Sequence, residues 1–274
     1  EAKTLQVEIF MRQKIEKIEK TEQGFQVGPY AARKLLLATG SSQEGYAWAA
    51  QLGHTIQKPV PSLFTFNIPT SPLKELSGIS HNPVELSLCG TSLVQKGALL
   101  ITHFGFSGPA ALKLSAWGAK ILHEREYKTP LSINWLPDET TSQIFETLLA
   151  LKKAAPEKTL LAENPFRFPK NLWKALLRDE RRLNDISQKE LQILAHKLHA
   201  DIYQVEGKTT HKEEFVTCGG VSLKEVEFRT MESKVCPGLY FAGEILDIDG
   251  VTGGFNFQAA WTTGFIAGDS AINF

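Results

Sequence analysis

The feature that most constrains the fold is a pair of short apolar runs, far apart in the chain, that each end in glycine. The first is Lys34-Leu-Leu-Leu-Ala-Thr-Gly40, and the second is Gly238-Leu-Tyr-Phe-Ala-Gly243. Continuous apolar runs of this length predict fully buried strands. A glycine at the end of such a strand lets another group approach the backbone closely. We therefore expect both runs in one ligand-binding α/β domain.

The second run leads into a segment whose residue types suit a nucleotide ligand. Glu244 follows the strand, and its carboxylate can accept hydrogen bonds from the vicinal hydroxyl groups of a ribityl or ribose chain. Gly253 and Gly254 then precede a predicted helix that starts near Asn256, and the free N–H groups of that helix start would face the ligand. Such donors would stabilise the negative charge of a reduced flavin. The alternative is a tight glycine turn with exposed acidic residues.

Periodicity predicts further elements around these strands. Alternating apolar residues from Val7 to Met11 open an antiparallel meander that ends before Gly28. Spacings of three and four predict helices between 141 and 199, where Ser187-Gln-Lys-Glu190 forms a capping box. The remaining predictions are a helix over 44–52, strands over 62–68, 84–89, 98–102 and 131–135, a helix that begins at Pro109, and a final helix over 256–272.

The order of these elements predicts one domain interrupted by another. We expect an α/β fold of composite α+β character, in which residues 1–60 and 215–274 form the first domain. Residues 61–214 would form an inserted β-rich and helical domain that binds the substrate.

Composition disfavours several classes of partner. Thirty basic residues balance thirty acidic ones, so no global field attracts nucleic acid or an anionic membrane. The longest apolar runs are far shorter than the roughly 20 residues of a membrane-spanning helix. The start of the chain shows no secretory signal, and the three cysteines lack Cys-x-x-Cys spacing. We therefore expect a cytoplasmic protein with a small-molecule substrate, without a nucleic-acid or membrane partner and without a metal site.

Two further residues carry reactive groups. His103 lies between a predicted strand and a glycine loop, where it could protonate a substrate or hydrogen-bond a flavin; a structural histidine is the competing interpretation. Cys218 precedes two glycines, but the sequence shows no second cysteine or activating base nearby, which argues against a redox role. His103 is therefore the single catalytic candidate, and the other catalytic residues stay unknown.

Several long motifs, in order along essentially the whole chain, closely resemble those of one bacterial family. It is the NAD(P)/FAD-dependent oxidoreductase family that includes bile-acid dehydro-steroid reductases and proteins named aminoacetone oxidases. The motifs are Leu76-Ser-Gly-Ile79, Thr102-His-Phe-Gly-Phe-Ser-Gly-Pro109, Val216-Thr-Cys-Gly-Gly-Val221, Thr230-Met-Glu-Ser-Lys234, Gly238-Leu-Tyr-Phe-Ala-Gly-Glu244 and Asp249-Gly-Val-Thr-Gly-Gly-Phe-Asn256.

The resemblance implies a glutathione-reductase-like FAD domain interrupted by a β-barrel-like domain with a small helical unit. By that likeness Thr39–Gly40 would lie near the dinucleotide, Glu244 beside the ribityl hydroxyls, and Ile15 near adenine. Phe255 and Asn256 would turn backbone N–H groups toward the pyrimidine edge of the isoalloxazine. The cofactor-binding residues expected in all are Ile15, Thr39, Gly40, Gly243, Glu244, Gly254, Phe255 and Asn256.

The sequence departs from the family in two respects. The segment Ser41-Ser42-Gln43-Glu44-Gly45 after Ala-Thr-Gly is shorter than in many relatives, which would alter the dinucleotide contacts there. Family members open with a strand, a Gly-x-Gly-x-x-Gly turn for the FAD pyrophosphate and an acidic residue for its ribose, and this unit is not found in the sequence. We expect that a missing N-terminal segment supplies it, in cis or in trans. Without that segment a sheet edge and an apolar face would be exposed, so the fragment alone would bind FAD poorly and be inactive.

Two functions fit these observations. The leading hypothesis is an FAD-dependent oxidoreductase that transfers hydride between NAD(P)H or substrate and an unsaturated or amine-type small molecule, with NAD(P)H as a transient donor. The alternative is a non-catalytic flavin-binding or interaction protein, a degenerate or truncated remnant. A flavin-dependent modifier of nucleic acid is disfavoured because the charge is balanced and no basic patch with interleaved aromatic residues occurs.

Overall fold

The computed structural model describes residues 2, 4–209 and 216–273, and the chain divides into two compact units. The chain passes between them within strands β5 (Ile56–Ser62) and β13 (Val216–Val221), which pair as a two-stranded sheet. Cofactor binding by residues 1–60 and 215–274 and substrate binding by residues 61–214 remain predictions. The first unit consists of Glu1–Pro59, Gly219–Ile248 and Asn256–Phe274, and the second of Val60–Cys218 and Asp249–Phe255.

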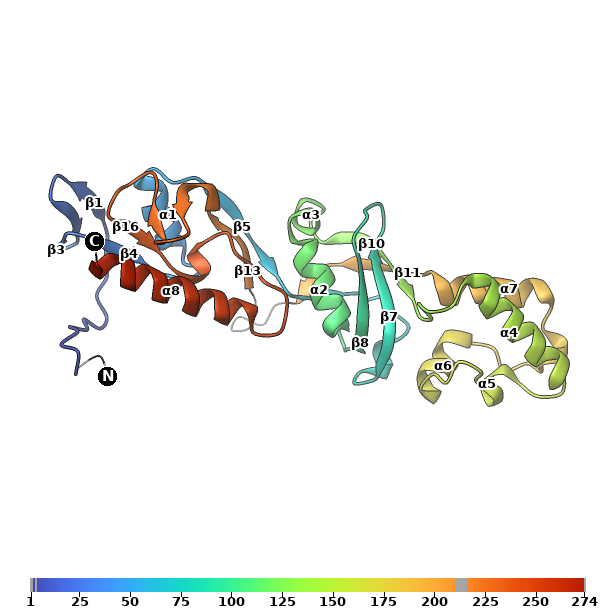
Figure 1. The fold of residues 1–274 in the computed structure, drawn as a ribbon. Helices are drawn as coiled ribbons and strands as arrows, with labels where there is room; N and C mark the ends of the chain where they lie inside the picture. Colours follow the sequence, from blue (N-terminus) through green and yellow to red (C-terminus); the bar gives the residue numbers. More distant parts are fainter. Residues whose placement is uncertain (1, 3, 210–215, 274) are drawn as a thin grey trace. The chain divides into compact units, whose positions relative to one another are not determined.

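A three-stranded antiparallel meander lies near the start of the first unit (Figure 1). The strand predicted from Val7 to Met11 is wrong, because residues 7–17 contain no strand and both side chains are more than half exposed. Alternation alone does not make a strand where no described segment supplies a ladder partner. The rest of the predicted meander is confirmed by β1 (Ile18–Thr21) and β2 (Gly24–Val27), and β3 (Tyr30–Ala32) adds a third strand that was not predicted.

The second sheet of the first unit brings the two glycine-terminated runs together. Strands β16 and β4 run parallel in this sheet, and Phe241 is paired with Leu37. The N–H of Ala242 donates to the carbonyl oxygen of Leu37 at 3.1 Å, which extends the ladder. The carboxyl ends of the two strands therefore meet at one edge. The strand order is β14 (Val226–Glu227), β15 (Glu232–Ser233), β16 (Leu239–Phe241) and β4 (Leu35–Leu37).

The two runs differ in burial. Strand β16 is fully buried as predicted, whereas β4 lies at the edge of the sheet in the described chain. Leu36 is 39% exposed, so the predicted full burial of the first run is wrong. The predicted helix that follows is confirmed as α1 (Gln43–Gln51). An unpaired apolar edge such as that of β4 is usually covered by another segment in native proteins.

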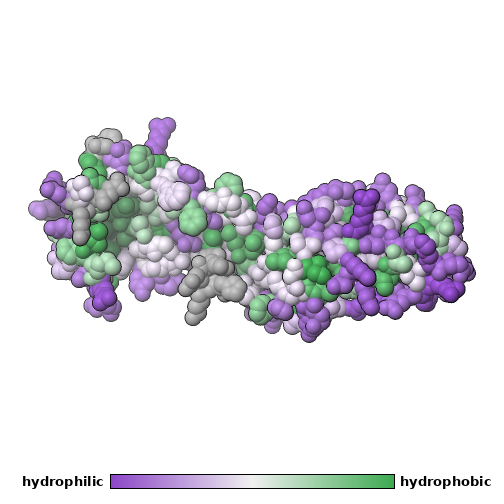
Figure 2. All heavy atoms as spheres, turned by 90° about the horizontal axis from the view of Figure 1, so that it is seen from below, coloured by the Kyte–Doolittle hydropathy of each residue, from purple (hydrophilic) through white to green (hydrophobic). Residues whose placement is uncertain are grey.

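Helix α8 (Phe255–Asn273) confirms the helix predicted over 256–272. Ala267 on one side is completely buried in the core of the first unit. Hydrophobic residues are exposed on this part of the surface in the view of Figure 2. A stripe of this kind is typical of a helix face that packs against further polypeptide. We use the name α8 stripe for four side chains of this helix that are each at least 70% exposed: Phe257, Trp261, Phe265 and Ile272.

The second unit contains a seven-stranded sheet. In the described residues β11 and β12 end the sheet without pairing with each other, so the sheet is open and the expected barrel is not confirmed. Helix α2 (Pro109–Trp117) starts with proline as predicted, and Leu114 is buried in the core of this unit. A short helix, α3 (Ala119–Glu124), follows. The strand order is β11 (Asp201–Glu206), β10 (Lys128–Asn134), β7 (Ser80–Leu88), β8 (Val94–Ile101), β9 (Gly105–Ser107), β6 (Thr65–Asn67) and β12 (Lys208–Thr209).

The helices predicted between 141 and 199 also belong to the second unit, and their existence is confirmed. The capping box is present, because Glu190 N–H donates to Ser187 Oγ at 3.2 Å and Ser187 N–H donates to Glu190 Oε2 at 2.7 Å. Buried leucines on these helices join the core of the sheet. The helices are α4 (Thr141–Ala154), α5 (Leu160–Glu163), α6 (Lys170–Leu177) and α7 (Gln188–His199).

None of the helices in residues 2, 4–209 and 216–273 is long and apolar enough to cross a bilayer. Over the same residues no group of three His, Cys, Asp or Glu side chains is placed to hold a metal ion.

Candidate functional site

The carboxyl edge of the parallel strand pair gathers four of the expected cofactor-binding residues. Thr39 and Gly40 follow β4, and Gly243 and Glu244 follow β16. Both glycines have positive φ, +60° and +75°, which is a conformation that lets the chain turn sharply and leave backbone groups uncovered. Ligands of α/β domains bind at this end of the strands. This edge is therefore the candidate site of the first unit.

Two buried hydroxyl groups in this region have no hydrogen-bond partner in the described part of the chain. They are Oγ1 of Thr39 and Oη of Tyr46, which lies on α1. Helix α1 approaches closely because residue 45 is glycine, and a Cβ there would lie 1.9 Å from Thr39 Oγ1. An unsatisfied buried hydroxyl costs about 1–3 kcal/mol. A polar ligand or an ordered water at this edge could satisfy both of them.

The acidic residues after β16 help to raise the pKa of the Tyr46 phenol. Its pKa is raised to about 12, first by burial and then by the carboxylates of Glu244 and Asp247. The phenol is therefore neutral at physiological pH and keeps its proton for donation to a ligand oxygen. Glu244, by contrast, offers carboxylate oxygens that accept. The edge thus holds both a donor and an acceptor for a hydroxyl-rich ligand.

Helix α8 is attached to this edge through Thr263. Its Oγ1 accepts a hydrogen bond from the N–H of Gly243 at 2.9 Å and donates to the carbonyl oxygen of Ala259 at 2.7 Å. Asn256 lies in the first turn of the same helix and in the same unit. N–H groups of a first helical turn have no acceptor within the helix. Such groups are bound by acceptors outside the helix.

The remaining expected residues lie elsewhere. Ile15 is half-buried against the core of the first unit, next to the turn at Gly28. Gly254, with φ +85°, and Phe255 belong to the second unit. His103 lies in an exposed bend between β8 and β9 and does not line the cavity of its unit. Ile15 thus shares the first unit with the strand edge, whereas Gly254, Phe255 and His103 belong to the second unit.

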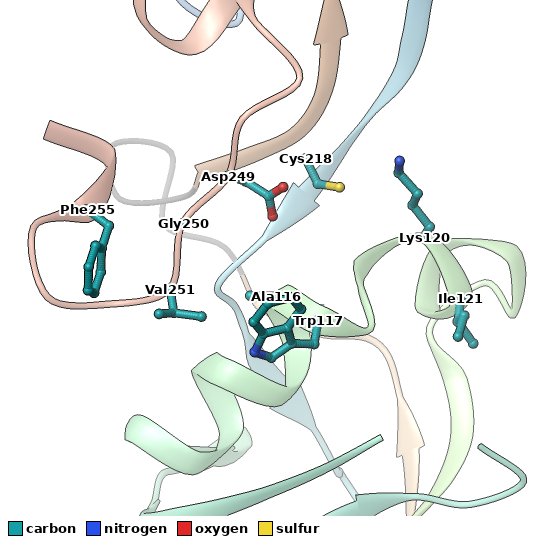
Figure 3. Close-up of a pocket in the computed structure, with 9 residues that line it drawn as sticks. All are labelled: Ala116, Trp117, Lys120, Ile121, Cys218, Asp249, Gly250, Val251 and Phe255. Atoms are coloured by element: carbon teal, nitrogen blue, oxygen red, sulfur yellow. The ribbon is translucent and has the colours of Figure 1, made fainter. Parts of the chain in front are cut away.

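The second unit contains a cavity of about 580 Å³, bounded by α2, α3 and the segment 249–255 (Figure 3). Trp117 and Phe255 are 65% and 59% exposed, although both are large aromatic side chains. The volume is within the range of small-molecule sites. The apolar lining consists of Ala116, Trp117, Ile121, Val251 and Phe255.

Polar side chains line the other side of the cavity in the view of Figure 3. They are Lys120 from α3, Cys218 from β13, and Asp249. The Ser62 hydroxyl donates to Asp249 Oδ2 at 2.9 Å, which fixes the carboxylate. Cys218 packs in a small buried cluster and lines the cavity. The cavity is therefore amphipathic, with one apolar and one polar side.

A third group of polar residues forms a buried network in the first unit. Ser233 Oγ accepts hydrogen bonds from the N–H groups of Val235 at 3.0 Å and Cys236 at 2.7 Å, and lies 2.7 Å from His54 Nε2. Because both lone pairs of Oγ are in use, its proton goes to Nε2. The imidazole proton is then on Nδ1, which lies 3.2 Å from Glu225 Oε2. The Thr230–Lys234 motif therefore contributes a buried structural residue, Ser233.

The network should make stability depend on pH. Burial lowers the pKa of His54, against the opposing effect of Glu225. The folded protein therefore keeps His54 neutral where the unfolded chain binds a proton, near pH 6.5. The pKa of Glu225 is also lowered: burial raises it, but hydrogen bonds from Thr55 and the contact with His54 outweigh burial. Both groups contribute stability that is present at neutral pH and lost as the pH falls.

We therefore expect His54→Gln to flatten the pH dependence of stability. Urea unfolding at pH 7.5 and pH 5.5 should show a smaller loss of unfolding free energy in the variant than in the wild type, because the titrating group is gone. His196→Gln, at an exposed position of α7, is the matched control and should keep the wild-type slope. An unchanged slope in His54→Gln would show that the network does not titrate on unfolding.

Several of these residues carry no signal in the sequence. Tyr46 looks like an ordinary core residue of a predicted helix, and its unpaired hydroxyl is visible only once α1 is packed. Trp117 and Lys120 lie where one helix ends and the next begins, outside every motif. The exposure of Trp117 at the end of α2 is visible only in the structure.

Comparison with known proteins defines the class. The model of the family described as "HI0933-like protein Rossmann domain" matches residues 1–270. The 3-dehydro-bile acid delta(4,6)-reductase of Clostridium scindens is 28% identical over 291 residues, which cover 99% of this chain and 71% of that protein. The ribosomal RNA dihydrouridine synthases of Haemophilus influenzae and Escherichia coli are 31% and 32% identical over 278 and 283 residues.

The family match extends over nearly the whole chain, so this chain belongs to the HI0933-like Rossmann-domain family. A mixed α/β fold with a Rossmann-type domain and an oxidoreductase class of the flavin type are thereby supported. The alignments to the two synthases cover 95% and 96% of this chain and 66% and 67% of those proteins. The chain therefore spans about two thirds of the length of these curated relatives.

Proposed function

We propose that this chain carries the larger part of an FAD-dependent reductase that adds hydride to a carbon–carbon double bond conjugated to a carbonyl. The observation that carries this proposal is the parallel pair β4 and β16, whose ends place Thr39, Gly40, Gly243 and Glu244 at one edge. The unpaired hydroxyls of Thr39 and Tyr46 support a polar ligand there. FAD fits this donor and acceptor set because its ribityl chain is rich in hydroxyls.

The names of the relatives support the type of reaction. A delta(4,6)-reductase of a 3-dehydro-bile acid removes ring double bonds conjugated to a 3-oxo group. A dihydrouridine synthase saturates the ring double bond of uridine that is conjugated to a carbonyl. Both reactions add two hydrogen atoms across an activated C=C bond. We propose the same step for this chain, which narrows the broader class of unsaturated or amine-type substrates.

The residues of the edge would hold FAD in distinct ways. Glu244 would accept hydrogen bonds from ribityl hydroxyls, and Tyr46 would donate to an oxygen of the ligand. Thr39–Gly40 would lie beside the dinucleotide, with Ile15 near the adenine. Phe255 and Asn256, the first residues of α8, would donate backbone hydrogen bonds to the pyrimidine edge of the isoalloxazine. FAD bound in this way would supply the hydride, with NAD(P)H as its proposed reductant.

We also propose that a segment bearing a phosphate-binding turn covers α8, in cis or in trans. The four exposed side chains of the α8 stripe and the edge position of β4 support this. A strand added at β4 and a helix packed on the stripe would bury both features. The diphosphate of FAD would then be bound by that segment, because the sequence here has no Gly-x-Gly-x-x-Gly turn.

A second candidate has the same chemistry on RNA. It is favoured by the two relatives named ribosomal RNA dihydrouridine synthase, which are more than 30% identical to this chain. The balanced net charge, with 30 basic and 30 acidic residues, argues against an RNA substrate. A small molecule therefore remains the first proposal, and ribosomal RNA the second.

An anaerobic titration tests whether the flavin turns over. The natural protein is mixed with FAD and then with NADH or NADPH, and the flavin absorbance is followed. Bleaching of the flavin band supports an oxidoreductase with a nicotinamide donor. A flavin that binds but is not reduced by either nicotinamide or by any reducing substrate would favour the alternative of a non-catalytic flavin-binding protein.

A further inference from the structure

We propose that the cavity of the second unit is a substrate pocket for a planar ring with a carbonyl conjugated to a C=C bond, and that Lys120 binds the carbonyl oxygen. The identity of the ring rests on the proposed function. The pocket itself does not, because all its lining residues belong to the second unit.

The apolar side of the cavity suits a flat ring. Trp117, Val251 and Phe255 come from two segments distant in sequence, and Figure 3 shows them on the same side of the cavity. The two aromatic rings are more than half exposed. Aromatic side chains bury large areas against planar ligands and prefer stacked or edge-on contacts. A planar ligand in the cavity would cover surfaces that the described chain leaves in water.

The polar side supplies one cation for a ligand oxygen. Lys120 is exposed, lines the cavity and makes no ion pair or side-chain hydrogen bond with the described residues. The Asp249 carboxylate already accepts a hydrogen bond from Ser62. An ammonium group has three donors and no acceptor, so it suits a carbonyl oxygen rather than a hydroxyl donor. Lys120 is therefore the residue assigned to orient the ring.

The assignment also fits the charge that the proposed reaction produces. In the proposed reaction the carbon β to the carbonyl would gain the hydride that FAD supplies, a C–H bond would form there, and the π electrons would move onto the oxygen. A proton from solvent then adds to the α carbon and restores the carbonyl. Negative charge would build on the oxygen in between, and the ammonium group of Lys120 next to it would stabilise that charge.

The size of the cavity favours a fused ring system over a single ring. A volume of about 580 Å³ corresponds to roughly 20 water molecules at about 30 Å³ each. A steroid-like ketone would fill this space, whereas one uracil ring would leave most of it to water. The steroid-like ketone and the uracil ring carry the same conjugated carbonyl, so Lys120 alone does not distinguish them. A binding experiment with one probe of each kind does.

Binding is measured by calorimetry on the natural protein as it is purified. The probes are a 3-oxo-4,6-diene bile acid and a uridine-containing oligoribonucleotide. Saturable binding of the bile acid supports a fused-ring substrate, and binding of the oligonucleotide alone supports a nucleobase. Lys120→Met should weaken binding about tenfold or more, since a hydrogen bond to a charged group is lost, and Lys120→Arg should retain most of it.

The controls distinguish a loss of probe binding from a loss of folding and from a loss of FAD binding. Lys128→Met removes an exposed lysine of β10 that does not line the cavity, and it should bind like the wild type. Trp117→Ala should weaken binding while the far-ultraviolet circular dichroism is retained. The proposal is overturned if neither probe binds, or if Lys120→Met and Lys128→Met bind equally well. A protein that binds a probe as described but takes up no FAD keeps the pocket and refutes the proposed function.

Discussion

Gly45→Ala is expected to lower the free energy of unfolding by about 2–3 kcal/mol, the upper range for overpacking of a buried contact. The added Cβ would lie 1.9 Å from Oγ1 and 2.8 Å from Cβ of Thr39. Thr39 is β-branched and short, so rotation of its side chain cannot clear both contacts. Either α1 moves away from the sheet or the turn after β4 is displaced. Urea unfolding measures the loss, and FAD affinity should fall with it because Thr39 lies at the proposed site.

A double-mutant cycle shows whether the contact with Thr39 is the cause. Thr39→Gly removes both clashing atoms, so adding it to Gly45→Ala should recover at least about 1 kcal/mol relative to additivity. Gly264→Ala on α8 is the matched control, because nothing lies within 4 Å of a Cβ built there. It should raise stability by up to about 1 kcal/mol, as expected for glycine to alanine inside a helix. Additive single effects would mean that the steric account of α1 is wrong.

Glu244→Ala is expected to weaken FAD binding by about 10- to 100-fold. The estimate follows from losing hydrogen bonds between a carboxylate and ligand hydroxyls, worth about 1.5–3 kcal/mol. Glu244→Gln should be intermediate, since the amide oxygen still accepts a hydrogen bond but carries no charge. Fluorescence titration of FAD into the natural protein measures the dissociation constants.

The same variant has a second readout that does not depend on flavin. Glu244 helps to raise the pKa of Tyr46 to about 12, so its removal should lower that pKa toward 10 in an ultraviolet titration of the phenol. Glu227→Ala, an exposed carboxylate on β14, should change neither quantity. Suppose that Glu244→Ala lowers the pKa of Tyr46 and leaves the affinity for FAD unchanged. That result would refute the proposed contact of Glu244 with the ribityl hydroxyls and would agree with the position of Glu244 near Tyr46.

The strands and helices of the site could be predicted because they depend on local patterns. The apolar run of β16 and the long helix α8 needed only hydrophobicity and glycine placement. The parallel pairing of β4 with β16 was not predictable from residue patterns alone. It joins segments about two hundred residues apart, and no local preference specifies such a pairing.

Other features depend on packing that no local pattern reports. The alternation from Val7 to Met11 has the period of a strand but no partner to pair with in the described chain. The role of Gly45 as a close contact for Thr39 appears only when α1 is docked. The cavity combines the end of α2 with a loop more than a hundred residues later, so Trp117 and Phe255 could not be associated from the sequence.

The most direct test of the central claim is a single turnover without oxygen. The natural protein is loaded with FAD, reduced with dithionite, and mixed with a 3-oxo-4,6-diene bile acid or with ribosomal RNA that lacks dihydrouridine. The account predicts that the flavin is reoxidised in stoichiometric amount by one of these substrates and that the product gains two hydrogen atoms by mass spectrometry. A flavin that stays reduced with both substrates, with neither product gaining mass, would contradict the account.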